Sequence, residues 1–211
     1  MIFNTEESMA ETAAKKLKLL LLDVDGVLTD GKLYFTNSGE EMKSFHSLDG
    51  HGIKMLIETG VEVGIITGRT SKLLEKRSHD LGIELLVQGR QDKLNVLTEI
   101  MEATGLDFEE IGYAGDDLPD IPVLQMVGSS FSVPLGHTLV KSSVQAITET
   151  EGGSGAVREI ADFILNAQGN YERWVSLTNG EEERCEQTAA ANSALCMQLI
   201  APCADASCGF T

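Results

Sequence analysis

The run Leu19–Leu22 ends abruptly in Asp23 and Asp25, and this feature limits the possible folds more than any other. A short apolar run without polar alternation is typical of a strand that is buried on both faces. We therefore expect a strand at about residues 17–23, with the two carboxylates at the rim of a sheet. A sheet covered on both faces requires a layer of helices on each side.

Further short apolar runs alternate with helical patterns along the chain. The runs occupy residues 61–67, 83–87, 111–114 and 131–133, and the helical patterns occupy residues 50–59, 71–81, the segment around Leu94, Leu97 and Met101, and residues 155–166. This alternation predicts an α/β fold with a doubly wound, Rossmann-like parallel sheet. Ligands bind such sheets beyond the carboxyl ends of the strands.

A β-hairpin is expected to be inserted after the first strand. Asn37-Ser38-Gly39 forms a turn signal between residues 32–36 and residues 41–46. We expect this hairpin either to assemble with another subunit or to flank its own site.

The chain is strongly acidic, with 16 Lys and Arg against 33 Asp and Glu and a net charge of −17. We expect no nucleic-acid or membrane partner, because phosphate backbones bind clustered Lys and Arg. The first 16 residues resemble no secretory signal, and no apolar run approaches the ~20 residues that span a bilayer. The expected location is the cytoplasm.

Three segments are expected along the chain: a frayed or weakly helical lead-in at residues 1–16, one main domain at 17–178, and an irregular tail at 179–211. All the cysteines lie in the tail, at Cys185, Cys196, Cys203 and Cys208. A disulfide framework for the main domain is therefore excluded, and without a C-x-x-C pair a zinc site is not expected.

Residues capable of chemistry follow several of the expected strands. They are Asp23 and Asp25, Thr67-Gly68-Arg69, Lys93, and Asp116, Asp117 and Asp120. Taken singly, an Asp or Thr-Gly after a strand is more often a turn former or a helix cap. A parallel sheet would gather all of them at one edge, so together they indicate a site.

The acidic residues indicate a magnesium site. Asp23 and Asp25 are two positions apart, so an extended backbone would point both the same way. Carboxylates that close need a cation or a shared proton. Asp116 and Asp120 add further negative charge, and hard oxygen ligands suit Mg²⁺. With the Thr67 hydroxyl and the Lys93 ammonium as a phosphate cradle, the set predicts phosphoryl transfer through an aspartyl-phosphate.

These motifs resemble those of the haloacid-dehalogenase superfamily. Asp23-Val24-Asp25-Gly26-Val27-Leu28-Thr29-Asp30 is similar to its first motif, and Thr67, Lys93 and Gly115-Asp116-Asp117 are similar to the second, third and fourth. Over about residues 17–168, the segments DVDGVLTDG, FHSLDGHGIK, IITGR, GDDLPD and GGSGAVREI resemble the superfamily's phosphatases for 3-deoxy-D-manno-octulosonate 8-phosphate. That resemblance implies a capless, magnesium-dependent homotetramer that makes a lipopolysaccharide precursor. The gaps between the motifs hold only the expected hairpin, helices and strand, which leaves no room for a cap domain.

The catalytic roles that we expect follow from the motifs. Asp23 is the expected nucleophile and Asp25 the general acid and then base, while Thr67 and Lys93 bind the phosphoryl group. Mg²⁺ is expected on the carboxylates of Asp23 and Asp116 and on the backbone carbonyl of Asp25. Asp117 and Asp120 would orient that shell.

The substrate-binding residues are carried over from the resemblance and from the scarcity of basic residues near the site. They are Asp25, His46, Ser47, Leu48, Asp49, Gly50, Lys54, Gly68, Arg69, Arg77 and Lys93. Arg69 and Arg77 are expected to bind the carboxylate of a sugar acid phosphate, because an arginine fork suits a carboxylate.

Three other functions remain open from the sequence. A sister phosphatase for a nine-carbon keto sugar acid phosphate would carry the same motifs. A phosphorylatable receiver domain gathers similar residues, but its phosphoacceptor Asp lies on a different strand from its acidic pair. A non-catalytic oligomerisation module is disfavoured, because no motif residue is missing.

Overall fold

The computed structural model describes residues 1–37, 41–172, 174 and 175. The chain divides into two units, Met1–Tyr171 and Glu172–Thr211. The expected tail at 179–211, with its four cysteines, lies outside the described residues, and its boundary stays a prediction.

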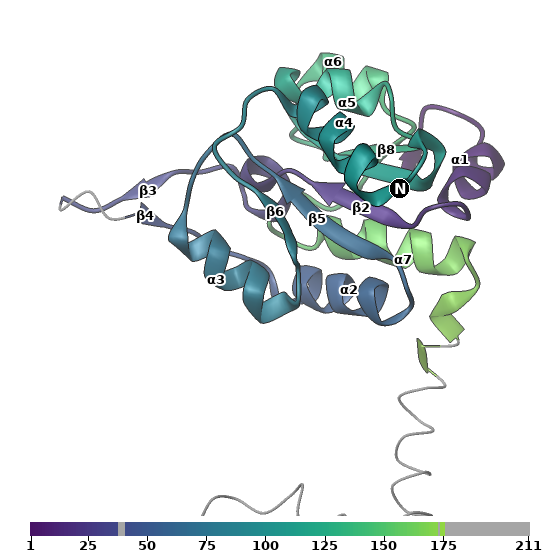
Figure 1. Ribbon diagram of the computed structural model, residues 1–211, viewed down its shortest axis with the longest axis horizontal. Coiled ribbons are helices and arrows are strands. Elements are labelled where there is room, and N and C mark those ends of the chain that lie inside the picture. Colours follow the sequence, from purple (N-terminus) through teal and green to yellow (C-terminus); the bar gives the residue numbers. More distant parts are fainter. Residues whose placement is uncertain (38–40, 173, 176–211) are drawn as a thin grey trace, which may run out of the picture. The chain divides into compact units, whose positions relative to one another are not determined.

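The first unit is built on one seven-stranded sheet with the order β1-β9-β8-β7-β2-β5-β6 (Figure 1). The strands are β1 (Ile2–Phe3), β9 (Ala146–Ile147), β8 (Ser129–Ser132), β7 (Ile111–Ala114), β2 (Leu19–Leu22), β5 (Glu62–Ile66) and β6 (Leu85–Val87). Among the described strands of this sheet, β1 alone pairs antiparallel. The predicted α/β fold with a mostly parallel sheet is confirmed, and no cap domain lies among the described residues.

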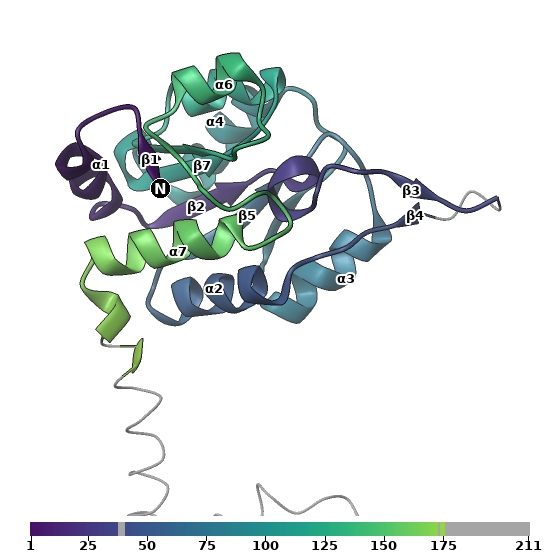
Figure 2. The same cartoon turned by 180° about the vertical axis from the view of Figure 1, so that it is seen from behind.

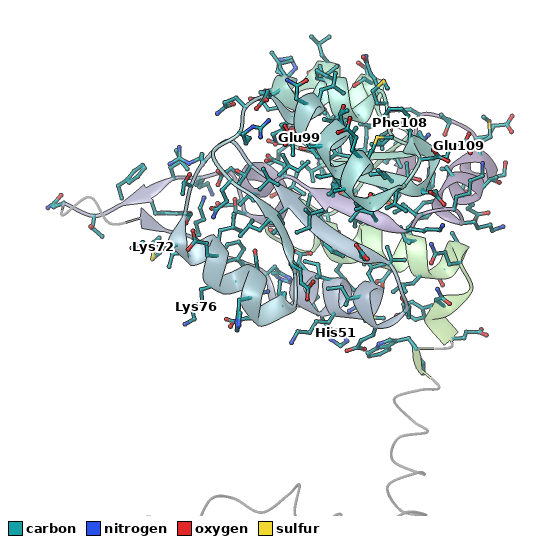
Figure 3. All side chains as sticks on the ribbon, in the orientation of Figure 1. His51, Lys72, Lys76, Glu99, Phe108 and Glu109 are labelled. Atoms are coloured by element: carbon teal, nitrogen blue, oxygen red, sulfur yellow. The ribbon has the colours of Figure 1, made fainter. Side chains whose placement is uncertain are left out.

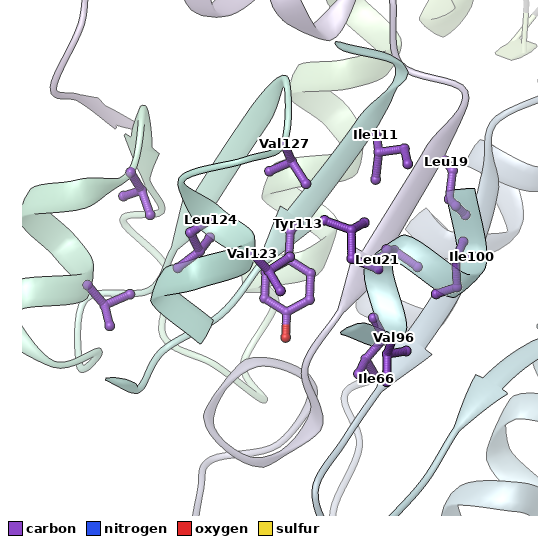
Figure 4. Close-up of a cluster of buried hydrophobic side chains, with 13 residues drawn as sticks. Leu19, Leu21, Ile66, Val96, Ile100, Ile111, Tyr113, Val123, Leu124 and Val127 are labelled. Carbon is purple, nitrogen blue, oxygen red and sulfur yellow. The ribbon is translucent and has the colours of Figure 1, made fainter. Parts of the chain in front are cut away.

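Helices cover both faces of the sheet, as Figures 1 and 2 show. One layer holds α4 (Lys93–Thr104), α5 (Ile121–Leu124) and α6 (Thr138–Ser143), and the other holds α2 (Ser47–Glu58), α3 (Lys72–Leu81) and α7 (Ala156–Ala167). The double layer explains the sequence of β2, since all four of its leucines are fully buried. Figure 4 shows Leu19 and Leu21 in the core with Ile111 and Tyr113 of β7, whose phenol is also fully buried.

The expected hairpin forms a separate two-stranded sheet between β2 and α2. Its strands β3 (Tyr34–Phe35) and β4 (Glu41–Met42) pair antiparallel, with Tyr34 opposite Met42. Figure 1 shows this hairpin extending away from the body of the first unit. We call residues 32–37 and 41–43 the arm.

The first 16 residues contribute more structure than a frayed or weakly helical lead-in. Ile2 pairs with Ile147 at the sheet edge, and the helix α1 (Glu7–Ala14) buries Ala10 and Ala14. A two-residue strand is too short for a recognisable pattern, and the same applies to β9. No helix among the described residues is long and apolar enough to cross a membrane.

Candidate active site

The turn that follows β2 places the first acidic motif. Directly after Asp23, residues Val24–Leu28 form a tight turn in which Gly26 has a positive φ of 106°. A Cβ atom at Gly26 would lie 2.2 Å from Oδ2 of Asp116, in the loop after β7. Glycine is therefore required twice at this position, by the backbone angle and by the close approach of the two loops.

A buried ionic cluster lies beside this turn. Nζ of Lys93, the first residue of α4, donates to Oδ1 of Asp23 at 2.8 Å and to Oδ1 of Asp120 at 2.6 Å. The same ammonium donates to the hydroxyl of Tyr113 at 3.1 Å, and that hydroxyl donates to Oδ1 of Asp120 at 2.7 Å. Burial alone would lower the pKa of Lys93, but Asp23 and Asp120 together raise it above its usual value. Lys93 is therefore a fixed positive charge beside Asp23.

Asp120 holds the loop after β7 as well as the lysine. Its Oδ2 accepts the backbone N–H groups of Asp116 and Asp117, each at 3.1 Å. The Asp117 carboxylate in turn accepts the N–H of Leu118 at 2.8 Å. Both oxygens of Asp120 are thus occupied by protein donors, and this carboxylate orients its neighbours.

The carboxylates of Asp23, Asp116 and Asp120 lie close together, with one oxygen of each within 4.8 Å of the others. Oδ1 of Asp116 is buried and has no hydrogen-bond partner. Burial and the nearby charge of Asp23 raise the pKa of Asp116 to about 7, and burial raises that of Asp23 to about 6 despite Lys93. One ammonium does not balance three carboxylates, so these residues fit a divalent cation with a preference for oxygen, such as Mg²⁺.

The carboxylate of Asp25 has two basic neighbours of its own. Its Oδ1 accepts from Nζ of Lys43 at 2.5 Å, and Nε of Arg69 lies 3.6 Å from its Oδ2. The extended backbone on which the shared direction of the Asp23 and Asp25 side chains depends is absent, because the turn begins at Val24. The two carboxylates therefore have separate surroundings.

The loop after β5 brings Thr67 and Arg69 to the same edge. Thr67 is buried, and its carbonyl accepts the N–H of Arg90 at 3.2 Å. A Cβ atom at Gly68 would lie 2.4 Å from Nε2 of Gln91, so this loop packs tightly against the segment leading to Lys93. The Thr67 and Lys93 motifs are thereby fixed beside one another.

The first turn of α2 supplies the expected substrate-binding segment His46–Gly50. The structure does not present the Asp49 carboxylate to a ligand: this residue is 1% exposed, and Oδ1 accepts the N–H of Arg158 in α7 at 2.8 Å. Asp49 therefore joins α2 to the start of α7. Ser47, Leu48 and Lys54 are exposed.

Arg77 lies behind that segment. Its Nη2 donates to the carbonyl of His46 at 3.4 Å, and its guanidinium lies 5.8 Å from the ring centre of Phe45. Lys72 and Lys76, on the same helix, extend into solvent (Figure 3). Arg77 thus differs from its exposed basic neighbours on α3. In this structure it supports the His46–Gly50 segment.

Two residues of this region were missed in the sequence, Tyr113 and Lys43. Tyr113 stands two positions before Gly115 as the polar member of an apolar strand, and that placement was an available signal. Lys43 lies in the arm, and nothing in its local sequence relates it to Asp25.

A surface hollow of about 1270 Å³ lies elsewhere, between residues 15–18, 107–110 and 166–170. These residues precede β2 and β7 or follow α7, so the hollow is at the opposite end of the strands. Lys16 and Lys18 pair there with Glu109 and Glu110, and Figure 3 shows Glu109 in that region. We assign no site to this hollow.

Comparison with known proteins identifies similar sequences. A family model described as haloacid dehalogenase-like hydrolase matches residues 83–160. The 3-deoxy-D-manno-octulosonate 8-phosphate phosphatase KdsC of Salmonella typhi is 45% identical over 161 residues, which cover 76% of this chain and 86% of the relative.

Solved structures agree with the sequence matches. A probable YrbI family phosphatase from Pseudomonas syringae has a TM-score of 0.80 at 47% identity, covering 81% of this chain and 97% of that one. The 3-deoxy-D-manno-octulosonate 8-phosphate phosphatase of Moraxella catarrhalis, solved with a magnesium ion, a phosphate ion and a KDO molecule, has a TM-score of 0.79 at 37% identity. The match covers 80% of this chain and 97% of the Moraxella chain.

Proposed function

The chain belongs to the haloacid dehalogenase-like hydrolases, in the family of 3-deoxy-D-manno-octulosonate 8-phosphate phosphatases, and from this premise we propose how it works. It is a phosphoric monoester hydrolase that converts the sugar acid phosphate to the free sugar acid and phosphate, a step that makes a lipopolysaccharide precursor. The observation that carries this function is the buried pair of Asp23 and Lys93 beside the acidic cluster at the end of β2.

Magnesium is the cofactor, and the residues present fit it. We propose that the carboxylates of Asp23 and Asp116 and the backbone carbonyl of Asp25 hold the ion. The unpartnered Oδ1 of Asp116 supports this assignment, and Asp117 and Asp120 orient the loop. Bound Mg²⁺ supplies positive charge that binds phosphate oxygens and offsets their negative charge.

In the proposed reaction, a carboxylate oxygen of Asp23 attacks phosphorus while Asp25 donates its proton to the leaving sugar oxygen. The P–O bond to the sugar breaks, and an aspartyl-phosphate remains on Asp23. Asp25 then takes a proton from water, whose oxygen attacks phosphorus and releases phosphate and the free Asp23 carboxylate. Lys93 holds Asp23 in place and offsets the charge that develops on the phosphoryl oxygens, with Thr67 as a second phosphate ligand.

The sugar acid is proposed to bind at the mouth of this site. Arg69 is half exposed beside Asp25, and the first turn of α2 with Lys54 lies on the element that follows the arm. Arg77 would act on the same substrate through the carbonyl of His46, or directly after giving up that hydrogen bond.

We also propose a cytoplasmic homotetramer that assembles through the arm. The arm exposes Leu33, Phe35 and Met42, of which Phe35 is 62% and Met42 61% exposed. Exposed apolar groups of this kind mark interaction surfaces. Light scattering should give four chains for the wild type and fewer for Phe35→Asp, while Leu135→Asp, at a 72% exposed site outside the arm, serves as the matched control. Cell fractionation tests the location.

Phosphate release tests the activity itself. The purified chain should hydrolyse 3-deoxy-D-manno-octulosonate 8-phosphate with Mg²⁺ and lose that activity in excess chelator. A higher kcat/KM for a nine-carbon keto sugar acid phosphate would favour the sister phosphatase. Phosphorylation without turnover would favour a receiver domain, and no phosphate release from any ester would overturn the proposal.

A further inference from the structure

The arm delivers a buried cation to the carboxylate that is proposed to transfer protons. Lys43 directly follows β4, where the chain returns from the arm. Its Nζ lies 2.5 Å from Oδ1 of Asp25, and its side chain is 3% exposed. An ammonium buried this deeply is stable only when it is paired with a negative group, so the contact with Asp25 is a built feature of the site.

Arg69 holds the same carboxylate less firmly. Its Nε is 3.6 Å from Oδ2, beyond ordinary hydrogen-bond length, and its side chain is 44% exposed. The Asp25 side chain is itself 20% exposed. One side of this carboxylate is thus open to a ligand, while Lys43 holds it from the buried side.

The arm has little stability of its own. Its strands pair only with each other among the described residues, over two residue pairs. A two-stranded hairpin of this size is marginal in water. The pair of Lys43 and Asp25 therefore fixes two things at once, the base of the arm and the direction of the carboxylate.

We propose that Lys43 is a positioning residue for the reaction, which orients the Asp25 carboxylate for proton transfer to the leaving oxygen and from the attacking water. The inference rests on the proposed phosphatase function. It assigns to the arm a part in the chemistry of its own chain, in addition to any part in assembly.

The two chemical steps allow this role to be separated from a merely structural one. p-Nitrophenolate leaves without a proton, so forming the aspartyl-phosphate from p-nitrophenyl phosphate needs Asp25 little. Release of a sugar alcohol needs the proton in the first step, and hydrolysis of the aspartyl-phosphate needs Asp25 as a base with either substrate. Misplacing Asp25 should therefore slow the sugar ester throughout and leave a rapid first turnover of the aryl ester.

The experiment compares wild type with Lys43→Met, Lys43→Arg and the matched control Lys32→Met. Lys32 lies at the start of the arm, and its 72% exposed side chain pairs with Asp30. In Lys43→Met, we expect kcat for the sugar acid phosphate to fall about 10- to 100-fold while KM changes less than about threefold. A burst of about one nitrophenolate per site should precede slow turnover, and acid quenching should trap the phosphorylated chain.

Four further results are expected. Lys43→Arg restores part of the lost kcat, Lys32→Met behaves as wild type, and the Mg²⁺-induced rise in Tm of Lys43→Met equals that of wild type. Adding Lys43→Met to Asp25→Asn should cost nothing more in kcat, because residues that act as one unit are non-additive.

Two outcomes would overturn the inference while leaving the phosphatase function intact. One is a Lys43→Met enzyme with wild-type kcat on the sugar ester. The other is an equal loss with both esters and no burst, as expected of a merely structural role. A wild-type chain that releases phosphate from neither ester would instead overturn the phosphatase function, and this inference with it.

Discussion

Asp23 and Asp25 are two residues apart but differ in burial and in the elements that hold them. Asp23 is buried between Lys93, on a helix, and a loop that Asp120 holds rigidly. Asp25 is 20% exposed and is held by Lys43 from the arm, with Nε of Arg69 3.6 Å from its other oxygen. The comparison shows that one short turn can place a fixed nucleophile and a more accessible general acid and base two residues apart.

Substitution of Asp23 should give the largest effect and separate the two carboxylates most clearly. We expect Asp23→Asn to lower kcat by at least about 10⁴-fold, because the amide cannot form the aspartyl-phosphate. Lys93 keeps its contact with Asp120, so the circular dichroism spectrum should remain native. Near-normal activity of the Asp23→Asn enzyme would refute the nucleophile assignment.

Removal of Mg²⁺ should act mainly on the Asp23 side of the site. Excess chelator should abolish phosphate release, and added Mg²⁺ should restore it. The raised pKa values of Asp23 and Asp116, about 6 and about 7, mean that the metal-free folded chain binds more protons than the unfolded one.

These two groups therefore make the free energy of unfolding of the metal-free protein fall as pH rises from about 4 to about 7. The rise in Tm on adding Mg²⁺ should be larger at pH 8 than at pH 5.5, as calorimetry can measure. A pH-independent rise would argue against these carboxylates as the ligands.

Replacement of Lys93 should weaken the Asp23 side in two ways. Lys93→Ala should lower kcat by about 10²- to 10³-fold, because the developing negative charge loses its partner. It should also lower the free energy of unfolding by about 3–5 kcal/mol in denaturant titrations, since Asp23 and Asp120 are left buried without it. Altered KM with unchanged kcat would make Lys93 a binding residue only.

Replacement of Arg69 should affect the Asp25 side selectively. Arg69→Ala should lower kcat/KM for the sugar acid phosphate about tenfold, because the substrate carboxylate loses its fork. Arg77→Ala should have a similar effect, because the His46–Gly50 segment loses its support. Small phosphate esters without a carboxylate should be hydrolysed as before. Lys72→Ala and Lys76→Ala are the controls on exposed positions of α3. Equal losses on both substrates would end the specificity argument.

Replacement of Tyr113 by Phe should give the smallest effect. It tests whether the Tyr113 hydroxyl helps to place Lys93 beside Asp23. The change removes one hydroxyl that bridges Lys93 and Asp120 and costs about 1 kcal/mol of unfolding free energy. We expect kcat to fall about three- to fivefold. An unchanged enzyme would mean that Asp120 alone suffices to place Lys93.

The sequence predicted the parts of this site that depend on strand ends. The buried run of β2, the loops after β5 and β7, and the start of α4 are read from local patterns, and a parallel sheet brings them together. The edge strand β1 and its neighbour β9 were missed because two residues carry no periodicity. Their positions follow from pairing, of β1 with β9 and of β9 with β8.

Other parts of the site depend on contacts that no local pattern encodes. The direction of the Asp25 side chain follows from the turn at Val24–Leu28, and its partner Lys43 lies 18 positions away across the arm. Asp49 was expected to bind substrate, yet it caps a helix 109 positions further along the chain. The role of the Tyr113 hydroxyl follows only from its contact with Lys93, which no local pattern indicates.

The close approach of Gly26 to Asp116 limits how this gene can vary. Every single-base change that alters a glycine codon to another residue adds at least a Cβ atom, and here that atom has no room beside the Asp116 carboxylate. Any such change therefore displaces an oxygen of the acidic cluster, so a substitution in one loop damages the other. No replacement of Gly26 is therefore expected to be neutral, and any change in the sequence of this loop has to leave this glycine in place.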